Sequence, residues 1–173
     1  QQPIQEVFRE LVQNGTRNAL IQEDIRRAVS EGRRCLILSQ WKEHCQLLAK
    51  ALATCDLQPV VLDGTLGKKE RKTLLQRIES TPRAEPLIVI ATGQYLGEGF
   101  DCPQIDTLFL IFPLAFKGRL VQYVGRALRS FQGKNRVVVY DYADLQVPVL
   151  RSMHLKRLRA YKTLSFETVE EKA

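Results

Sequence analysis

The sequence lacks the features of a membrane-bound, secreted or zinc-binding protein. No apolar run approaches the roughly 20 residues that span a bilayer, and the first residues, QQP, have neither the basic start nor the apolar stretch of a secretory leader. The four cysteines form no Cys-x-x-Cys pair. His44 beside Cys45 supplies only part of the four ligands that a zinc site needs. Scattered thiols suit a reducing compartment. We therefore expect a cytoplasmic protein with no bound metal of its own and no membrane partner.

Two elements of an ATP-hydrolysing site are also missing. A phosphate-binding loop reads Gly-x-x-x-x-Gly-Lys-Ser/Thr, but Gly67-Lys68 is followed by Lys69, and Gly133-Lys134 by Asn135. No Asp-Glu pair follows an apolar strand to hold magnesium. The chain alone is therefore not expected to hydrolyse ATP. Because it does not begin with Met, we expect it to be a piece of a longer protein.

The positive charge of the chain is concentrated in its last third. With 173 residues, 45% of them hydrophobic, the chain can form one domain with a sizeable core. Residues 1–116 carry fourteen basic and fourteen acidic side chains, whereas residues 117–173 carry twelve against five. The whole excess of +7 therefore lies in residues 117–173. A polyanionic partner and a merely soluble basic face explain this pattern equally well.

Short apolar runs alternate with amphipathic segments along the chain. The apolar runs predict strands at residues 35–38, 60–62, 87–91, 108–112 and 137–140. Helical spacing predicts helices at residues 4–14, 18–31, 41–52, 68–78, 119–128 and 149–161. This order predicts an α/β fold, a three-layer α-β-α sandwich with a mostly parallel sheet. We divide it into an N-terminal helical connection (1–32), a core domain (33–145) and a C-terminal basic helix with its tail (146–173).

The loop after the third predicted strand carries residues suited to phosphate. It reads ATGQYLGEGFD over residues 91–101. The hydroxyl of Thr92 can donate to a phosphate, glycines allow close backbone approach, and Asp101 could accept from a ribose hydroxyl. The glycines could also merely shape a turn. The loop does not match the dinucleotide-binding fingerprint, because Cys102 stands where the third glycine would be.

A second phosphate-binding pattern is Gln122-Tyr-Val-Gly-Arg-Ala-Leu-Arg129. Arg126 and Arg129 are three residues apart, so a helix presents them on one face. Each guanidinium is a rigid fork of donors that matches phosphate oxygens. Gly125 permits close approach, and Gln122 lies one turn before Arg126. The alternative is that both arginines are only solvated.

Together these two patterns resemble motifs V and VI of superfamily 2 helicases. Residues 36–39, followed by an amphipathic helix, are similar to motif IV, and Asp63-Gly64-Thr65 with Arg71 is similar to the element after the next strand. The resemblance covers residues 33–142 and implies the RecA-like C-terminal motor domain. The sequence of residues 97–101 is more similar to that of restriction-enzyme and excision-repair motors than to that of the Asp-Glu-Ala-Asp group of RNA helicases. It therefore favours double-stranded DNA over RNA.

The resemblance implies a nucleotide-facing set of residues. Arg126 and Arg129 would be arginine fingers that reach ATP and its Mg²⁺, held mainly on an N-terminal RecA-like domain of the same protein. Gln122 would help to place the γ-phosphate or the attacking water. Gly99 and Asp101 would couple the nucleotide to the nucleic-acid strand, with Gly125 also on the nucleotide side.

The resemblance also implies a nucleic-acid-facing set, in which side chains contact the phosphate backbone of the tracking strand. Its members are Thr92, Gly93, Ser39 and Thr65.

Three alternatives remain beside the motor. The chain could bind nucleic acid without motor activity, or its basic third could bind an acidic protein. A dinucleotide enzyme is the third alternative, which the missing third glycine disfavours. The helix at 149–161 could dock through Leu150, Met153, Leu155 and Leu158 and turn a basic face, including Arg157, to DNA. It could equally be a plain surface helix.

Overall fold

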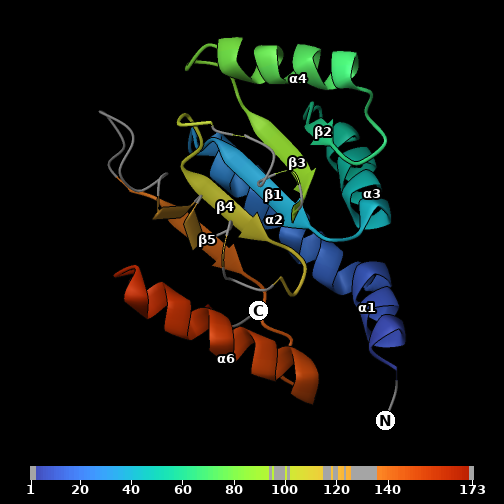
Figure 1. Ribbon diagram of the computed structural model, residues 1–173, viewed down its shortest axis with the longest axis vertical. Coiled ribbons are helices and arrows are strands. Elements are labelled where there is room, and N and C mark those ends of the chain that lie inside the picture. Colours follow the sequence, from blue (N-terminus) through green and yellow to red (C-terminus); the bar gives the residue numbers. More distant parts are fainter. Residues whose placement is uncertain are drawn as a thin grey trace.

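The computed structural model describes residues 3–93, 95, 100, 102–114, 118, 121, 122, 124, 125 and 136–171. Among them are the helices α1 (Ile4–Gln13), α2 (Gly15–Ser30), α3 (Lys42–Ala53), α4 (Lys68–Ser80) and α6 (Pro148–Thr163). The strands are β1 (Cys35–Ser39), β2 (Val60–Leu62), β3 (Ile88–Thr92), β4 (Thr107–Leu110) and β5 (Val138–Asp141). They form one parallel sheet in the order β2-β3-β1-β4-β5 (Figure 1). The predicted α/β fold is confirmed, with strand boundaries that differ from the predicted ones by at most two residues.

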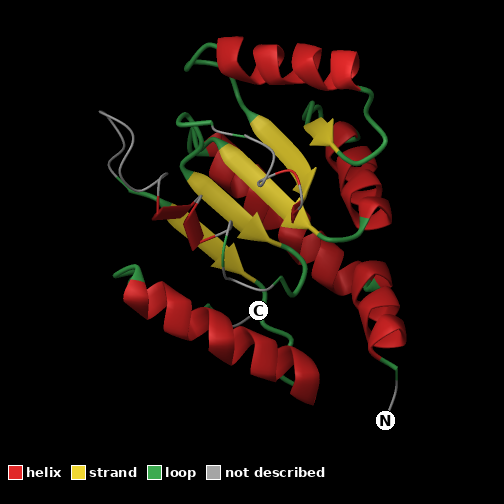
Figure 2. Cartoon of the chain, in the orientation of Figure 1, coloured by secondary structure: helices red, strands yellow, loops and turns green. Residues whose placement is uncertain are grey.

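Helices pack against both faces of the sheet, and Figure 2 shows one of them, α2, crossing behind the strands. Alternate residues of each strand point to opposite faces, so Leu36 and Leu38 of β1 pack in one cluster and Cys35 and Ile37 in another. The first cluster includes Ile78 of α4 and Tyr161 of α6, and the second is covered by α2 and α3. Every residue of β1 and β3 is buried. Each fully buried Leu, Ile or Val contributes about 1.5–3 kcal/mol, so these two central strands dominate the core.

The first two helices are separated by a single residue. The predicted helices end at residue 14 and begin again at residue 18, but α2 begins at Gly15. The cause is Asn14, whose side chain accepts a hydrogen bond of 2.9 Å from the backbone N–H of Arg17 and caps α2.

The N-terminal helices pack against the rest of the described chain. Ile21 and Ile25 of α2 are fully buried in the same cluster as Ile37 of β1. Val7 and Leu11 of α1 belong to a smaller cluster, which also contains Phe112, just beyond β4, and Leu150 of α6. The division after residue 32 stays a prediction. Among the described residues, no helix has the length and apolarity needed to cross a membrane.

Candidate functional site

The described residues that end or follow the strands lie along one edge of the sheet. All five strands are parallel, so their carboxyl ends meet at the same edge, which is where ligands bind in such sheets. Ser39, Thr92 and Asp141 end β1, β3 and β5, and Asp63 follows β2. The segment 111–114 leaves β4 at this edge and leads along the chain towards Gln122.

Ser39 is enclosed in a chain of hydrogen bonds. Its side chain is completely buried, its Oγ lies 3.2 Å from His44 Nδ1, and the N–H of Trp41 donates to the same oxygen at 3.2 Å. The other ring nitrogen of His44, Nε2, lies 3.1 Å from Asn18 Oδ1, and the Asn18 amide donates to the Val12 carbonyl at 2.8 Å. A phosphate contact through Ser39 would require some of these bonds to break, and its role stays a prediction.

The geometry assigns His44 as a neutral imidazole. Asn18 Oδ1 can only accept, so Nε2 carries the proton and Nδ1 accepts from the Ser39 hydroxyl. Burial lowers the pKa of His44 to about 4, and the positive charge of Arg17 adds to the effect. This neutral histidine links β1, α2 and α3. In the sequence, the only sign of this role is that His44 falls within the helix predicted at residues 41–52.

Asp63 and Thr65 form a compact turn after β2. Both the backbone N–H of Thr65, at 2.9 Å, and its hydroxyl donate to Asp63 Oδ1. Burial raises the pKa of Asp63, but these bonds and the charge of Lys42 outweigh it, so the pKa lies below its usual value. The Asp63 carbonyl accepts from the hydroxyl of Tyr95, whose ring lies 4.8 Å from the guanidinium carbon of Arg71. Thr65 itself is exposed, and its predicted phosphate contact stays untested.

Thr92 differs from the other two hydroxyls. It is 5% exposed at the end of β3, and its Oγ1 has no hydrogen-bond partner within the described part of the chain. A Cβ added to the following Gly93 would lie 3.5 Å from Cδ2 of Leu114. The loop after β3 and the segment after β4 are therefore in close contact at this edge.

Two of the six residues in the nucleotide-facing set, Gln122 and Gly125, fall on described residues. Gln122 is exposed, and its backbone N–H donates to the Gly118 carbonyl at 3.0 Å. Apart from its chain neighbours and its own helix backbone, no described heavy atom lies within 4 Å of a Cβ built on the half-buried Gly125. Four other predicted members lie outside the described residues, and their roles stay predictions: Arg126, Arg129, Gly99 and Asp101.

Helix α6 docks through a buried ion pair that the sequence interpretation missed. Arg157 is 2% exposed, and its Nε and Nη2 donate to the two oxygens of Asp141 at 2.8 Å each. The Tyr161 hydroxyl donates to the same carboxylate at 2.7 Å. Burial lowers the pKa of Arg157, but the hydrogen bond and charge of Asp141 outweigh it and raise the pKa above its usual value. Arg157 is therefore not part of a basic face.

The expected docking stripe of α6 is partly wrong. Leu150 is buried, and Met153 and Leu158 pack against the core, as expected, but Leu155 is 49% exposed. Helical spacing from Leu150 leads to 153–154, 157–158 and 161, which leaves Leu155 on the outer face.

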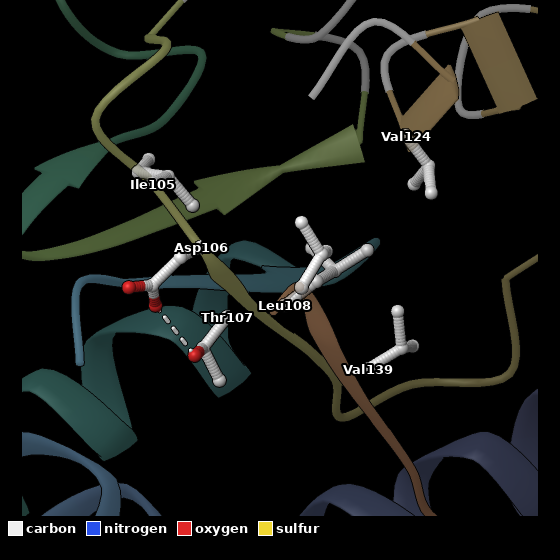
Figure 3. Close-up of a pocket in the computed structure, with 7 residues that line it drawn as sticks. Ile105, Asp106, Thr107, Leu108, Val124 and Val139 are labelled. Atoms are coloured by element: carbon white, nitrogen blue, oxygen red, sulfur yellow. Dashed lines mark hydrogen bonds between the residues drawn. The ribbon is translucent and has the colours of Figure 1, made fainter. Parts of the chain in front are cut away.

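A small hollow among the described residues lies over β4 and β5. Figure 3 shows Ile105, Leu108, Val124 and Val139 around it. Its volume is about 10 Å³, which is room for roughly one water molecule. It cannot hold a nucleotide. Among the described residues, no group of three or more His, Cys, Asp or Glu side chains could hold a metal ion.

Comparison with known proteins places the fold in one family. The model of the helicase conserved C-terminal domain matches residues 15–131. This chain belongs to that family. The putative mitochondrial ATP-dependent helicase irc3 of Schizosaccharomyces pombe is 30% identical over 102 residues, which cover 59% of this chain and 16% of that protein. Transcript termination protein A18 of fowlpox virus is 22% identical over 125 residues, covering 72% and 26%.

Solved structures agree with the helicase C-terminal assignment. T4 UvsW has a TM-score of 0.72 at 15% identity, over 95% of this chain and 36% of that one. Domain 2 of the DEAD-box helicase Mss116p, solved with an RNA duplex, has a TM-score of 0.62 at 19% identity, over 82% and 56%. The resemblance to the RecA-like C-terminal domain of superfamily 2 helicases is confirmed. The chain spans about a sixth and a quarter of the length of irc3 and fowlpox A18, respectively.

Proposed function

We propose that this helicase C-terminal domain is the second motor domain of an ATP-dependent nucleic-acid helicase or translocase. The observation that carries the proposal is the hydroxyl of Thr92. It lies at the carboxyl end of β3 with no partner among the described residues, where the loops after β3 and β4 meet. A backbone phosphate supplies the acceptor that such a hydroxyl lacks. Gly93, beside it, would let the nucleic-acid backbone approach closely.

The nucleotide side is completed by a partner domain. ATP with its Mg²⁺ is expected mainly on an N-terminal RecA-like domain, where it supplies the γ-phosphoryl group whose transfer to water drives the motor. Arg126 and Arg129 would donate to phosphate oxygens and neutralise charge that develops during transfer, an effect worth roughly 10³–10⁵ in rate. The exposed amide of Gln122 is compatible with placing the attacking water.

The polyanion is proposed to be double-stranded DNA. Arg157 is buried, but α6 has four exposed basic residues: Arg151, Lys156, Arg159 and Lys162. Electrostatic binding through such side chains weakens steeply with salt. The Mss116p domain was solved with an RNA duplex, so an RNA duplex belongs in the test as a competing partner.

ATP hydrolysis by the full-length protein tests the proposal. We expect turnover that is stimulated more by double-stranded DNA than by an RNA duplex. Arg126→Ala or Arg129→Ala should lower kcat roughly 10³-fold while ATP binding is retained. Arg136→Ala is the matched control: Arg136 is exposed, precedes β5 at the opposite edge of the sheet, and should leave kcat unchanged. A full-length protein that binds nucleic acid without hydrolysing ATP would instead be a binding module, and the motor proposal would fail.

A further inference from the structure

The segment that leaves β4 is held by a buried arginine on each face of the sheet. Arg17 of α2 donates through Nη1 to the Ile111 carbonyl at 2.7 Å, and Nη1 of Arg157 lies 3.5 Å from the Leu114 carbonyl. Helix α2 packs in the cluster with Phe109, and α6 packs in the cluster with Leu110, on the opposite face. The backbone at residues 111–114 is therefore held from both sides.

Each arginine is balanced by an aspartate that lies at the end of β5 or three residues beyond it. Nε of Arg17 lies 3.1 and 3.2 Å from the two oxygens of Asp144, while Arg157 and Asp141 form the two-bond pair described above. The two guanidinium groups belong to residues only 8% and 2% exposed. A buried, hydrogen-bonded ion pair fixes its partners in one geometry, because leaving either charge unpaired is costly. The Arg157–Asp141 pair is therefore a rigid connection, whereas Asp144, the partner of Arg17, is 29% exposed and its pair fixes Arg17 less firmly.

These connections hold the backbone just before the nucleotide-facing residues. The chain continues from Leu114 to Gln122, Arg126 and Arg129. The Leu114 side chain also lies against Gly93, directly after Thr92. A shift of residues 111–114 would therefore disturb both predicted sites. The family match ends at residue 131, so Asp141, Asp144 and Arg157 lie beyond it.

We propose that Arg17 and Arg157 are positioning residues, which together hold residues 111–114 so that the segment carrying Gln122, Arg126 and Arg129 meets the nucleotide in a fixed place. The inference rests on the proposed function for its catalytic consequence. Neither arginine touches the nucleotide itself. Their effect is on geometry, and misplacement of about 1 Å can cost roughly 100-fold in rate.

The experiment compares conservative variants in the full-length protein. Arg17→Lys and Arg157→Lys keep the charge but lose the planar fork that binds carboxylate and carbonyl together. Arg34→Lys is the matched control. Arg34 is also buried, at 5% exposure, but its guanidinium binds the carbonyls of Thr81, Pro82 and Glu85 at the opposite edge of the sheet.

Two readouts separate positioning from general stability. Amide hydrogen exchange over residues 111–125 should become about tenfold faster in the Arg17 and Arg157 variants but not in the Arg34 variant. At a temperature where every variant is folded by circular dichroism, kcat should fall about 10- to 100-fold with KM for ATP unchanged. Arg34→Lys should lower the melting temperature without lowering kcat. If Arg157→Lys does not fold, the double variant Asp141→Asn/Arg157→Gln replaces it, because its two new side chains are neutral and leave no unpaired buried charge.

The outcomes distinguish this inference from the proposed function. Unchanged exchange at 111–125 overturns the positioning role, and so does faster exchange with full kcat. Loss of kcat in step with melting temperature across all three arginines also overturns it. If Arg126→Ala retains full turnover, the arginine-finger assignment fails, while hydrogen exchange still decides whether Arg17 and Arg157 hold the segment.

Discussion

Acidification should destabilise this domain through one buried histidine. His44 is fully buried between Ser39 and Asn18, and burial together with the charge of Arg17 lowers its pKa to about 4. In the unfolded chain the pKa returns to about 6.5. Between these values the unfolded state binds a proton that the folded state does not, so stability falls as pH drops from about 6.5 towards 4. Linkage gives a loss of about 2 kcal/mol at pH 5, rising to about 3 kcal/mol at the lower limit.

Urea unfolding at a series of pH values measures this loss. His44→Gln cannot be protonated, so the difference in unfolding free energy between wild type and variant should shrink by about 2 kcal/mol from pH 7.5 to pH 5. Other titrating groups are common to both proteins and cancel in this difference. His154→Gln keeps His44 and should retain its contribution. Parallel pH profiles for wild type and His44→Gln would refute the assignment of a buried neutral imidazole.

Three further outcomes follow from the structure. Ile25→Ala should lower the free energy of unfolding by about 2–5 kcal/mol in chemical denaturation, because Ile25 of α2 is fully buried against the sheet. Gly32→Ala should cost about 1 kcal/mol in the same assay. Gly32 follows α2 at a φ of +76° with open space around its Cβ position, so the cost is in the backbone alone. The isolated chain should show no ATP hydrolysis with or without DNA, and DNA-stimulated turnover from it would contradict the need for a partner domain.

The order of elements could be predicted because the core is built from local patterns. Fully apolar runs such as residues 35–38 are typical of strands buried on both faces, and the structure places them at the centre of a parallel sheet. Element ends were less accurate, because caps decide them. Asn14 starts α2 by bonding the N–H of Arg17, an effect that the periodicity of apolar residues does not contain.

The buried polar contacts could not be predicted from local pattern. Arg157 and Asp141 are sixteen residues apart, and Arg17 and Asp144 are 127 apart, so only the fold brings them together. The sequence alone does not show whether an arginine is buried or exposed. The positive charge that residues 117–173 present at the surface is therefore smaller than the sequence count suggests, because the charge of Arg157 is neutralised inside the domain.

The three hydroxyls predicted to contact phosphate should contribute differently to nucleic-acid binding. A hydroxyl that already has a hydrogen bond within the domain must break that bond before it can bind a phosphate, which reduces the net gain. Ser39 is already bonded to His44 and Trp41, and Thr65 to Asp63, whereas Thr92 has no partner among the described residues. A net hydrogen bond is worth about 1 kcal/mol.

Thr92→Val keeps the shape of the side chain and removes only the unpaired hydroxyl. It should therefore change the unfolding free energy by less than about 1 kcal/mol while weakening nucleic-acid-stimulated ATP hydrolysis in the full-length protein. Ser39→Ala should lower the unfolding free energy more than Thr92→Val does and weaken nucleic-acid-stimulated ATP hydrolysis less. The reason is that it leaves the buried His44 Nδ1 and Trp41 N–H without their partner. Equal effects of the two variants on stability and on nucleic-acid stimulation would contradict this ranking, because the hydrogen bonds within the chain would then not decide which hydroxyl meets the phosphate.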